Sequence, residues 1–297
     1  MIQLLTAQCY TAIEAVLRQS SRAFAESSDG RWQFVLAAGP PLPVTASIDA
    51  AFLLLDAPAP AEFDLEQAPR WLQWNATLPG AAKFALVPNP WQLRLRAELP
   101  VDDACISERI AAALQGFSAA AFLLQHKPVA LGASAVSPAA ASVPASAPEL
   151  RALLRENGWP FQERPDGAAS VDLALRGGSC RVVLGMNSAG PRAAMELLRA
   201  DSLTPASRLA LPALLLSASG SLRMSRPFAI GADGHFACGF EVQLASVPTA
   251  VELEFALEAL AVAGWACKDE LQSLLDHSVA RTFLAVRNLN PLPVEEE

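Results

Sequence analysis

The amino-acid sequence predicts an α+β protein made of two similar domains in tandem. Alternating apolar and polar residues mark strands between helical stretches, an uncharged Ala/Ser/Pro segment divides the chain, and the order of elements recurs after that segment. At 297 residues, the chain also exceeds the usual size of one compact core. We expect each domain to run helix, three strands, helix, two strands and helix.

The composition narrows the classes of function. The chain is 52% hydrophobic and 18% charged, so it can bury a core and is not of the disordered class. Its net charge of −8 argues against nucleic acid and against an anionic membrane surface as partners, because both attract basic proteins. No group of residues has the spacing of a cofactor site.

The compartment that the sequence predicts is the cytoplasm. Residues 1–20 have no basic residue ahead of an apolar run and include Glu14, which is unlike a secretory signal, and no window has transmembrane character. The five cysteines are widely spaced and show neither CxxC nor zinc-ligand spacing. We therefore expect buried free thiols in a reducing environment.

The first elements are a helix and a three-stranded meander. Apolar residues recur at helical spacing over residues 4–19. The turn dipeptide at Asp29 and Gly30 separates a short strand around Phe24 from a second strand at 32–36, and residues 43–55 read as a single third strand.

The next elements are a short helix, two strands and a longer helix. Pro69 suits the first turn of the helix, where a missing N–H costs nothing. Residues 91–99 alternate strictly between apolar and polar side chains, which predicts one face on the core and the other in water. Asp102 or Asp103 can cap the helix that follows, whose apolar stripe begins at Ile106.

A linker divides the chain. Residues 128–148 carry no charge and are almost entirely Ala, Ser, Pro and Val, a composition that cannot build a core. We expect domains at 1–127 and 149–297, the second with an extended helical end. The alternative, in which part of this segment packs as an edge strand, stays open.

The second domain repeats the first. The stretch 14–30 aligns without a gap to 151–167, and in later elements Leu72, Leu78 and Phe84 fall on Leu216, Leu222 and Phe228. Residues 1–126 carry 8 basic and 12 acidic residues and the rest of the chain carries 14 and 18, so each part has a charge of −4. This pattern predicts a tandem duplication.

The chain resembles the bacterial type III secretion chaperone-like fold, including its YbjN-type and sensory transduction regulator relatives. The resemblance is carried by Asn75-x-x-Leu78-Pro79, by 83–86 and 93–100, and in the second half by Asn157-Gly158-Trp159 and Asp166-Gly167. It implies domains that pair as dimers, bind a partner polypeptide and have no enzymatic activity. With two copies in one chain, we expect the halves to pair with each other, giving a monomeric pseudo-dimer.

Two tryptophans and two arginines are the candidate partner-binding residues. Trp71 and Trp74 lie three apart on one helical face, and either they pack between the halves or one is exposed and anchors a partner. Arg94 and Arg96 lie on the polar face of the strand at 91–99. The sequence indicates no catalytic residue and no metal ligand; the acidic run Glu62, Asp64, Glu66 precedes a helix start, where carboxylates suit the helix dipole.

Three hypotheses of function follow. The first is a non-enzymatic module that holds an extended peptide or partner protein in apolar grooves and at strand edges. The second, its alternative, is a regulatory protein of the YbjN type that docks a folded partner. An enzyme is the third, and it has the least support because no acid–base pair or nucleophile arrangement is visible.

Overall fold

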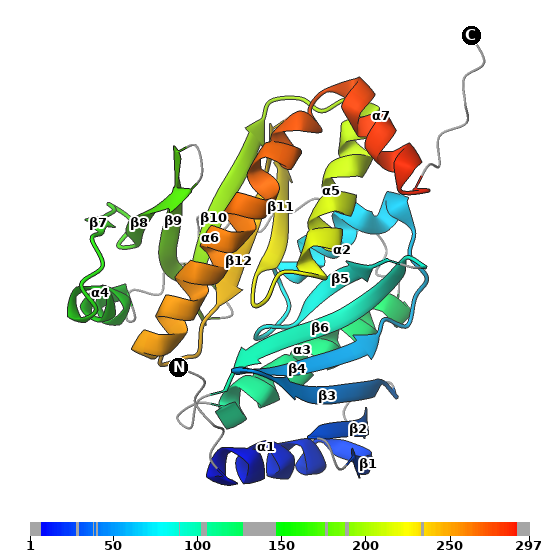
Figure 1. Ribbon diagram of the computed structural model, residues 1–297, viewed down its shortest axis with the longest axis vertical. Coiled ribbons are helices and arrows are strands. Elements are labelled where there is room, and N and C mark those ends of the chain that lie inside the picture. The colour runs from blue at the N-terminus through cyan, green and yellow to red at the C-terminus, as the bar shows by residue number, and fades with distance from the viewer. Residues whose placement is uncertain are drawn as a thin grey trace.

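The computed structural model describes residues 7–27, 30–37, 39, 41–88, 90–101, 106–126, 147–175, 178–187, 190–232 and 235–289. It contains two six-stranded antiparallel sheets, each covered by helices (Figure 1). This confirms the mixed α+β class. Residues 127–146, nearly all of the predicted linker, lie outside the described part, and α4 begins at Ala147, within the last residues assigned to that linker.

The first half forms one sheet in the order β1-β2-β3-β4-β6-β5. Its elements are α1 (Ala7–Gln19), β1 (Ser21–Ser27), β2 (Arg31–Leu36), β3 (Pro43–Asp49), β4 (Phe52–Pro58), the 3-10 helix η1 (Leu65–Gln67), α2 (Ala68–Asn75), β5 (Lys83–Val87), β6 (Gln92–Pro100) and α3 (Ile106–His126). Helix α3 packs on β6 and on α1.

The second half forms the other sheet, in the order β11-β12-β10-β9-β8-β7. Its elements are α4 (Ala147–Glu156), β7 (Gln162–Glu163), β8 (Ala169–Leu175), β9 (Gly178–Asn187), β10 (Gly190–Ala200), α5 (Pro205–Ser219), β11 (Arg226–Ala232), β12 (His235–Gln243), α6 (Ala250–Ser273) and α7 (His277–Val286). Read from the opposite edge, this strand order is the same as that of the first sheet.

The number of strands differs from the prediction. Each half has four strands, not three, before its middle helix. The segment 43–55 is two strands rather than one, because the chain reverses after Asp49 and Phe52 pairs back against it. The turn uses Ala50 at a φ of 55°. Alanine seldom adopts this left-handed conformation, so the sequence carries no turn signal there.

Strand β6 follows the predicted alternation with one exception. Leu93, Leu95 and Leu99 are buried, whereas Arg94 and Arg96 are partly exposed. Glu98 was expected to face water, but it is only 4% exposed. The second half covers this end of the strand. The alternation of residues within one strand cannot show that a distant part of the chain covers its polar face.

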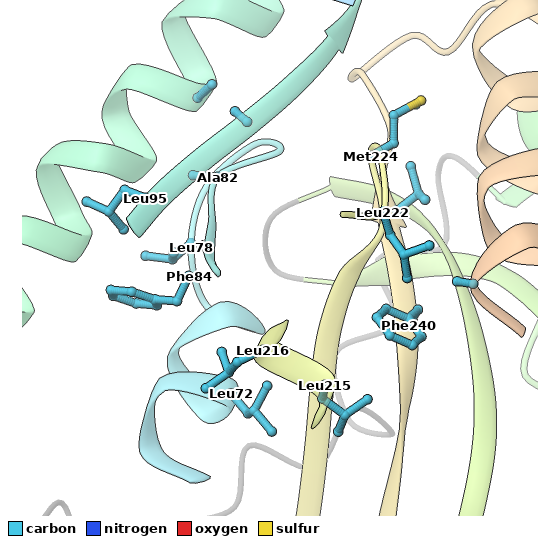
Figure 2. Packing of buried hydrophobic residues seen from close by; sticks show 14 of the residues in the cluster. Leu72, Leu78, Ala82, Phe84, Leu95, Leu215, Leu216, Leu222, Met224 and Phe240 are labelled. Carbon is cyan, nitrogen blue, oxygen red and sulfur yellow. The ribbon is translucent and has the colours of Figure 1, made fainter. Parts of the chain in front are cut away.

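The two halves exchange contacts through their middle helices. Helix α2 of the first half packs on β11 of the second, and α5 of the second half packs on β5 of the first (Figure 1). The two helices also pack on each other, with the fully buried side chains of Leu72 and Leu216 between them (Figure 2). The contact is therefore reciprocal, as in a symmetric dimer.

Candidate functional site

A buried lysine of the first half binds the second half. Lys83, at the start of β5, is fully buried, and its Nζ donates hydrogen bonds to the carbonyl oxygens of Leu222 at 2.7 Å and Ser225 at 3.1 Å. The same nitrogen lies 2.8 Å from the Glu98 carboxylate. Burial lowers the pKa of Lys83, and the charge and hydrogen bond of Glu98 oppose that shift. Glu98 is thus held out of water as the counter-ion of Lys83.

An arginine makes the reciprocal contact. Arg226, at the start of β11, is 1% exposed, and its Nη1 donates to the carbonyl oxygens of Leu78 at 2.7 Å and Gly80 at 3.2 Å in the first half. Its Nε and Nη2 donate to Glu241 Oε1 at 3.0 and 2.6 Å. Each half therefore inserts a cation, paired with its own glutamate, into the loop after the middle helix of the other half.

Aromatic contacts extend the interface on both sides of these cations. The rings of Phe52 on β4 and Phe255 on α6 lie 5.5 Å apart. The indole N–H of Trp91 donates to the carbonyl oxygen of Arg287 at 2.7 Å, just beyond α7. The extended helical end of the second half thus packs back on the first half.

The outer edge of β5 is closed by side chains from both halves. Asn75 Oδ1 accepts from the backbone N–H of Phe84 at 2.7 Å, and Asn75 Nδ2 lies 3.4 Å from the Phe84 carbonyl oxygen. Ser219, which occupies the corresponding position in α5, donates to that same carbonyl oxygen at 3.0 Å. β5 ends its sheet, so these bonds satisfy backbone groups that would otherwise be open to pairing.

The predicted tryptophans lie against rings of their own half. Trp71 is 3% exposed, with its ring 5.4 Å from that of Phe63. Trp74 is partly buried, and its ring lies 6.0 Å from that of Phe84. The burial of Trp71 leaves almost no surface for a partner, and its ring contact lies within the first half, whereas the packing interpretation placed it between the halves.

The predicted arginines meet on the open face of the first sheet. Arg94 pairs with Asp56 through two nitrogens, and Arg96 Nε lies 3.6 Å from Asp56 while its Nη1 donates to the Gly220 carbonyl oxygen. Both line an open hollow of about 360 Å³, together with residues 87, 88, 90 and 92. Neither tryptophan lines it, so the four predicted residues are not brought together in one site.

An exposed tryptophan on α6 was not among the predicted site residues. The side chain of Trp265 is 62% exposed, and Val251 and Val262 on the same helix are 50% and 53% exposed. Positions 251 and 262 are eleven residues apart, close to three helical turns, and so share a face. A helical projection of this segment places positions 251, 262 and 265 on one face. The apolar stripe at 253 and 257, from which the helix is predicted, lies on the opposite, buried face.

The remaining candidate groups have structural roles. Burial raises the pKa of the Cys238 and Cys267 thiols to about 12, which makes them poor nucleophiles. His235 is exposed and pairs with Asp201 at 3.0 Å, away from the buried Cys238. Asp64 accepts a hydrogen bond from the N–H of Glu66 at 3.0 Å and caps η1, as its place before a helix suggests.

Comparison with known proteins adds little. No family model matches the chain, and no curated protein does. A solved structure, that of the di-domain ARO/CYC StfQ from the steffimycin biosynthetic pathway, aligns over 95% of each chain at 11% identity, with a TM-score of 0.15. A score that low carries no argument about fold or function. No helix in the described ranges is long and apolar enough to cross a membrane.

Proposed function

We propose that this chain is a non-enzymatic, cytoplasmic protein-binding module, a tandem duplication whose halves form a monomeric pseudo-dimer like a type III secretion chaperone. The matching strand orders and the reciprocal packing of α2 and α5 support the duplication. Four described cysteines are buried and free, which suits a reducing compartment.

The observation that carries this proposal is the exposed apolar face of α6. Trp265, Val251 and Val262 are exposed there, whereas the surfaces through which such domains would pair are already occupied between the halves. Exposed tryptophan is over-represented among residues that anchor protein partners. We therefore assign partner binding to α6 of the second half rather than to the first half.

The charge around this face indicates the chemistry of the partner. Glu254 and Glu258 are exposed on α6 between the two valines, and the chain as a whole carries a charge of −8. A segment that presents apolar residues to Trp265 and basic residues to the two glutamates complements this face. The proposed partner is a basic amphipathic peptide segment.

The alternative is a regulatory protein that docks a folded partner through the same face. The solvent side of one helix is convex, and a convex surface suits a preformed groove on a folded protein as well as a free segment. The two functions differ in whether the segment binds when it is separated from its parent protein.

The test is binding of synthetic peptides by calorimetry. Basic amphipathic peptides should bind, acidic amphipathic peptides of equal length should not, and Trp265→Ala should weaken binding by about tenfold or more. The matched control is Val286→Ala, because Val286 is an exposed apolar residue on α7, at 76% exposure. Peptide binding that Trp265→Ala leaves unchanged in a folded protein would overturn the assignment to α6. Binding only to an intact folded partner would favour the alternative.

A further inference from the structure

A cavity of about 130 Å³ lies between the two halves, apart from the outer face of α6. The first half contributes the loop after α2 and residues of β6 and α3, including Glu98, Glu108 and Arg109. The second half contributes the start of β10, the loop after α5, the end of β12 and the start of α6, including Gln243 and Glu252. This volume exceeds the roughly 30 Å³ that one water molecule occupies in the liquid, so there is room for a small organic molecule.

Two buried acceptors in its wall make no hydrogen bond within the described part of the chain, Gln243 Oε1 and Glu252 Oε2, and the second of them lies 3.0 Å from Arg109 Nη2 as an ion pair. Gln243 is 8% exposed, and its Nε2 donates to the Pro191 carbonyl oxygen at 2.8 Å, which fixes the amide. Its Oε1 has no hydrogen-bond partner within the described part of the chain. A buried amide oxygen without a donor costs free energy, so this wall favours a group that brings an N–H or O–H.

The other polar groups of the cavity give it an acidic character. Glu98 is paired with Lys83 at 2.8 Å, and Glu252 lies 3.0 Å from Arg109. Glu108 is exposed and accepts from the hydroxyl of Ser246 at 2.6 Å, and no cation of the described residues lies within ion-pair distance of it. The cavity thus has one unneutralised carboxylate, at its exposed side.

We propose that this cavity binds a small organic cation with several N–H donors, an ammonium or a guanidinium compound. Gln243 Oε1 would accept one N–H, and Glu108 would supply the negative charge. Within the described ranges there is no group of three or more Asp, Glu, His or Cys side chains that could hold a metal ion. Acceptors spread over the walls suit donors spread over an organic cation.

Binding here also links the halves. Both halves line the cavity, so a bound cation contacts both and is lost when they separate. A ligand that binds only the paired, folded state raises the unfolding temperature with its concentration. The proposal is independent of peptide binding at α6, because neither Val262 nor Trp265 lines this cavity.

The test uses two pairs of probes on the full chain, followed by calorimetry and thermal unfolding. Each pair matches a cation with a neutral compound of similar size: ethanolammonium with ethylene glycol, and methylguanidinium with methylurea. A cation should bind and raise the unfolding temperature, and its neutral counterpart should do neither. Gln243→Leu and Glu108→Gln should each weaken binding by about tenfold.

Glu156→Gln is the matched control, because it removes one exposed carboxylate, on α4, outside the cavity. It should leave cation binding unchanged. If Gln243→Leu does not fold, Glu108→Gln at the exposed side decides the test. Equal weakening in all variants would mean diffuse charge attraction, and neutral compounds that bind as well as the cations would mean that the cavity does not select for positive charge. Either result, or no binding by either cation, overturns the proposal.

Discussion

The two buried cations hold the halves together at the starts of β5 and β11, but Lys83 makes three polar contacts and Arg226 makes four. Lys83 donates to two carbonyl oxygens of the second half and contacts Glu98. Arg226 donates to two carbonyl oxygens of the first half and, through two further nitrogens, to Glu241. A guanidinium presents its donors in a fixed fork, whereas an ammonium is a point charge. Leu78 corresponds to Leu222, so the two cations share one equivalent acceptor, whereas the second acceptor, Gly80 or Ser225, and the donor group differ.

The largest expected effects come from removing the two cations, and the loss of stability should be larger at Arg226 than at Lys83. Arg226→Met should lower the free energy of unfolding by about 3–5 kcal/mol, because it leaves Glu241 and two carbonyl oxygens buried without this donor. Lys83→Met should cost about 2–3 kcal/mol, since fewer hydrogen bonds are lost. Each glutamate keeps a second cation in these variants, Arg96 at 3.8 Å from Glu98 and Arg192 at 2.9 Å from Glu241, so the difference rests on the hydrogen bonds. Denaturant unfolding measures both losses.

Arg181→Met is the control for these two variants. It breaks the pair with Asp172, in which both side chains are about half exposed, and should leave the stability nearly unchanged. A loss at Lys83 equal to or larger than that at Arg226 would contradict the comparison.

A second comparison concerns the residue that ends each middle helix. A Cβ atom at Gly220, after α5, would lie 2.8 Å from the Leu86 carbonyl oxygen on β5. The corresponding residue after α2 is Ala76, which is exposed. Gly220→Ala should therefore cost about 1–3 kcal/mol by overpacking the contact between the halves. Ala76→Gly should change the free energy of unfolding by less than about 1 kcal/mol. Similar values for both in thermal unfolding would show that the approach of Gly220 to β5 is not tight.

The α+β class and the alternation of helical with extended regions could be predicted from the sequence, because helical and strand periodicities are local, but the prediction of three strands before each middle helix was wrong. The buried face of β6 followed from its alternation. The turn at Ala50 escaped prediction because alanine gives no turn signal. The cation contacts could not be predicted either, since Lys83 and Arg226 bind backbone groups 139 to 148 residues away. Every residue has a carbonyl oxygen, so the pattern of side chains does not indicate which of them will accept a hydrogen bond.

The candidate site was harder to predict than the fold. Trp71 and Trp265 are both tryptophans on helices, yet one is 3% and the other 62% exposed. Spacing places a residue on a face of its helix, but what covers that face depends on another part of the chain. The spacing of Trp71 and Trp74 therefore pointed to α2, and the single tryptophan on α6 was passed over.

A smaller effect distinguishes the two residues that close the edge of β5. Asn75→Ala should cost about 1–2 kcal/mol, because the buried Phe84 N–H loses its acceptor. Ser219→Ala should cost about 0.5–1 kcal/mol, since the Phe84 carbonyl oxygen keeps a contact with Asn75. Hydrogen exchange of the Phe84 amide provides a local readout: it should speed up in Asn75→Ala and change little in Ser219→Ala. The reverse order would assign the edge to the second half.

The last comparison concerns how the cores of the two halves respond to pH. Cys238 on β12 corresponds to Leu93 on β6, so only the second core has an ionisable group at this position. Burial raises the pKa of Cys238 from 9.0 to about 12. The unfolded thiol ionises first, so the stability that the buried thiol contributes is present below pH 9 and is lost as the pH rises from 9 toward 12. At pH 10 the loss is about 1 kcal/mol.

Cys238→Ala should remove this part of the pH dependence, because all other titrating groups are common to both proteins. The measurement is denaturant unfolding of the two proteins at pH 8 and pH 10. Parallel pH profiles for the two proteins would mean that Cys238 is accessible to water in the folded state, and that α6 covers this part of the second sheet only loosely.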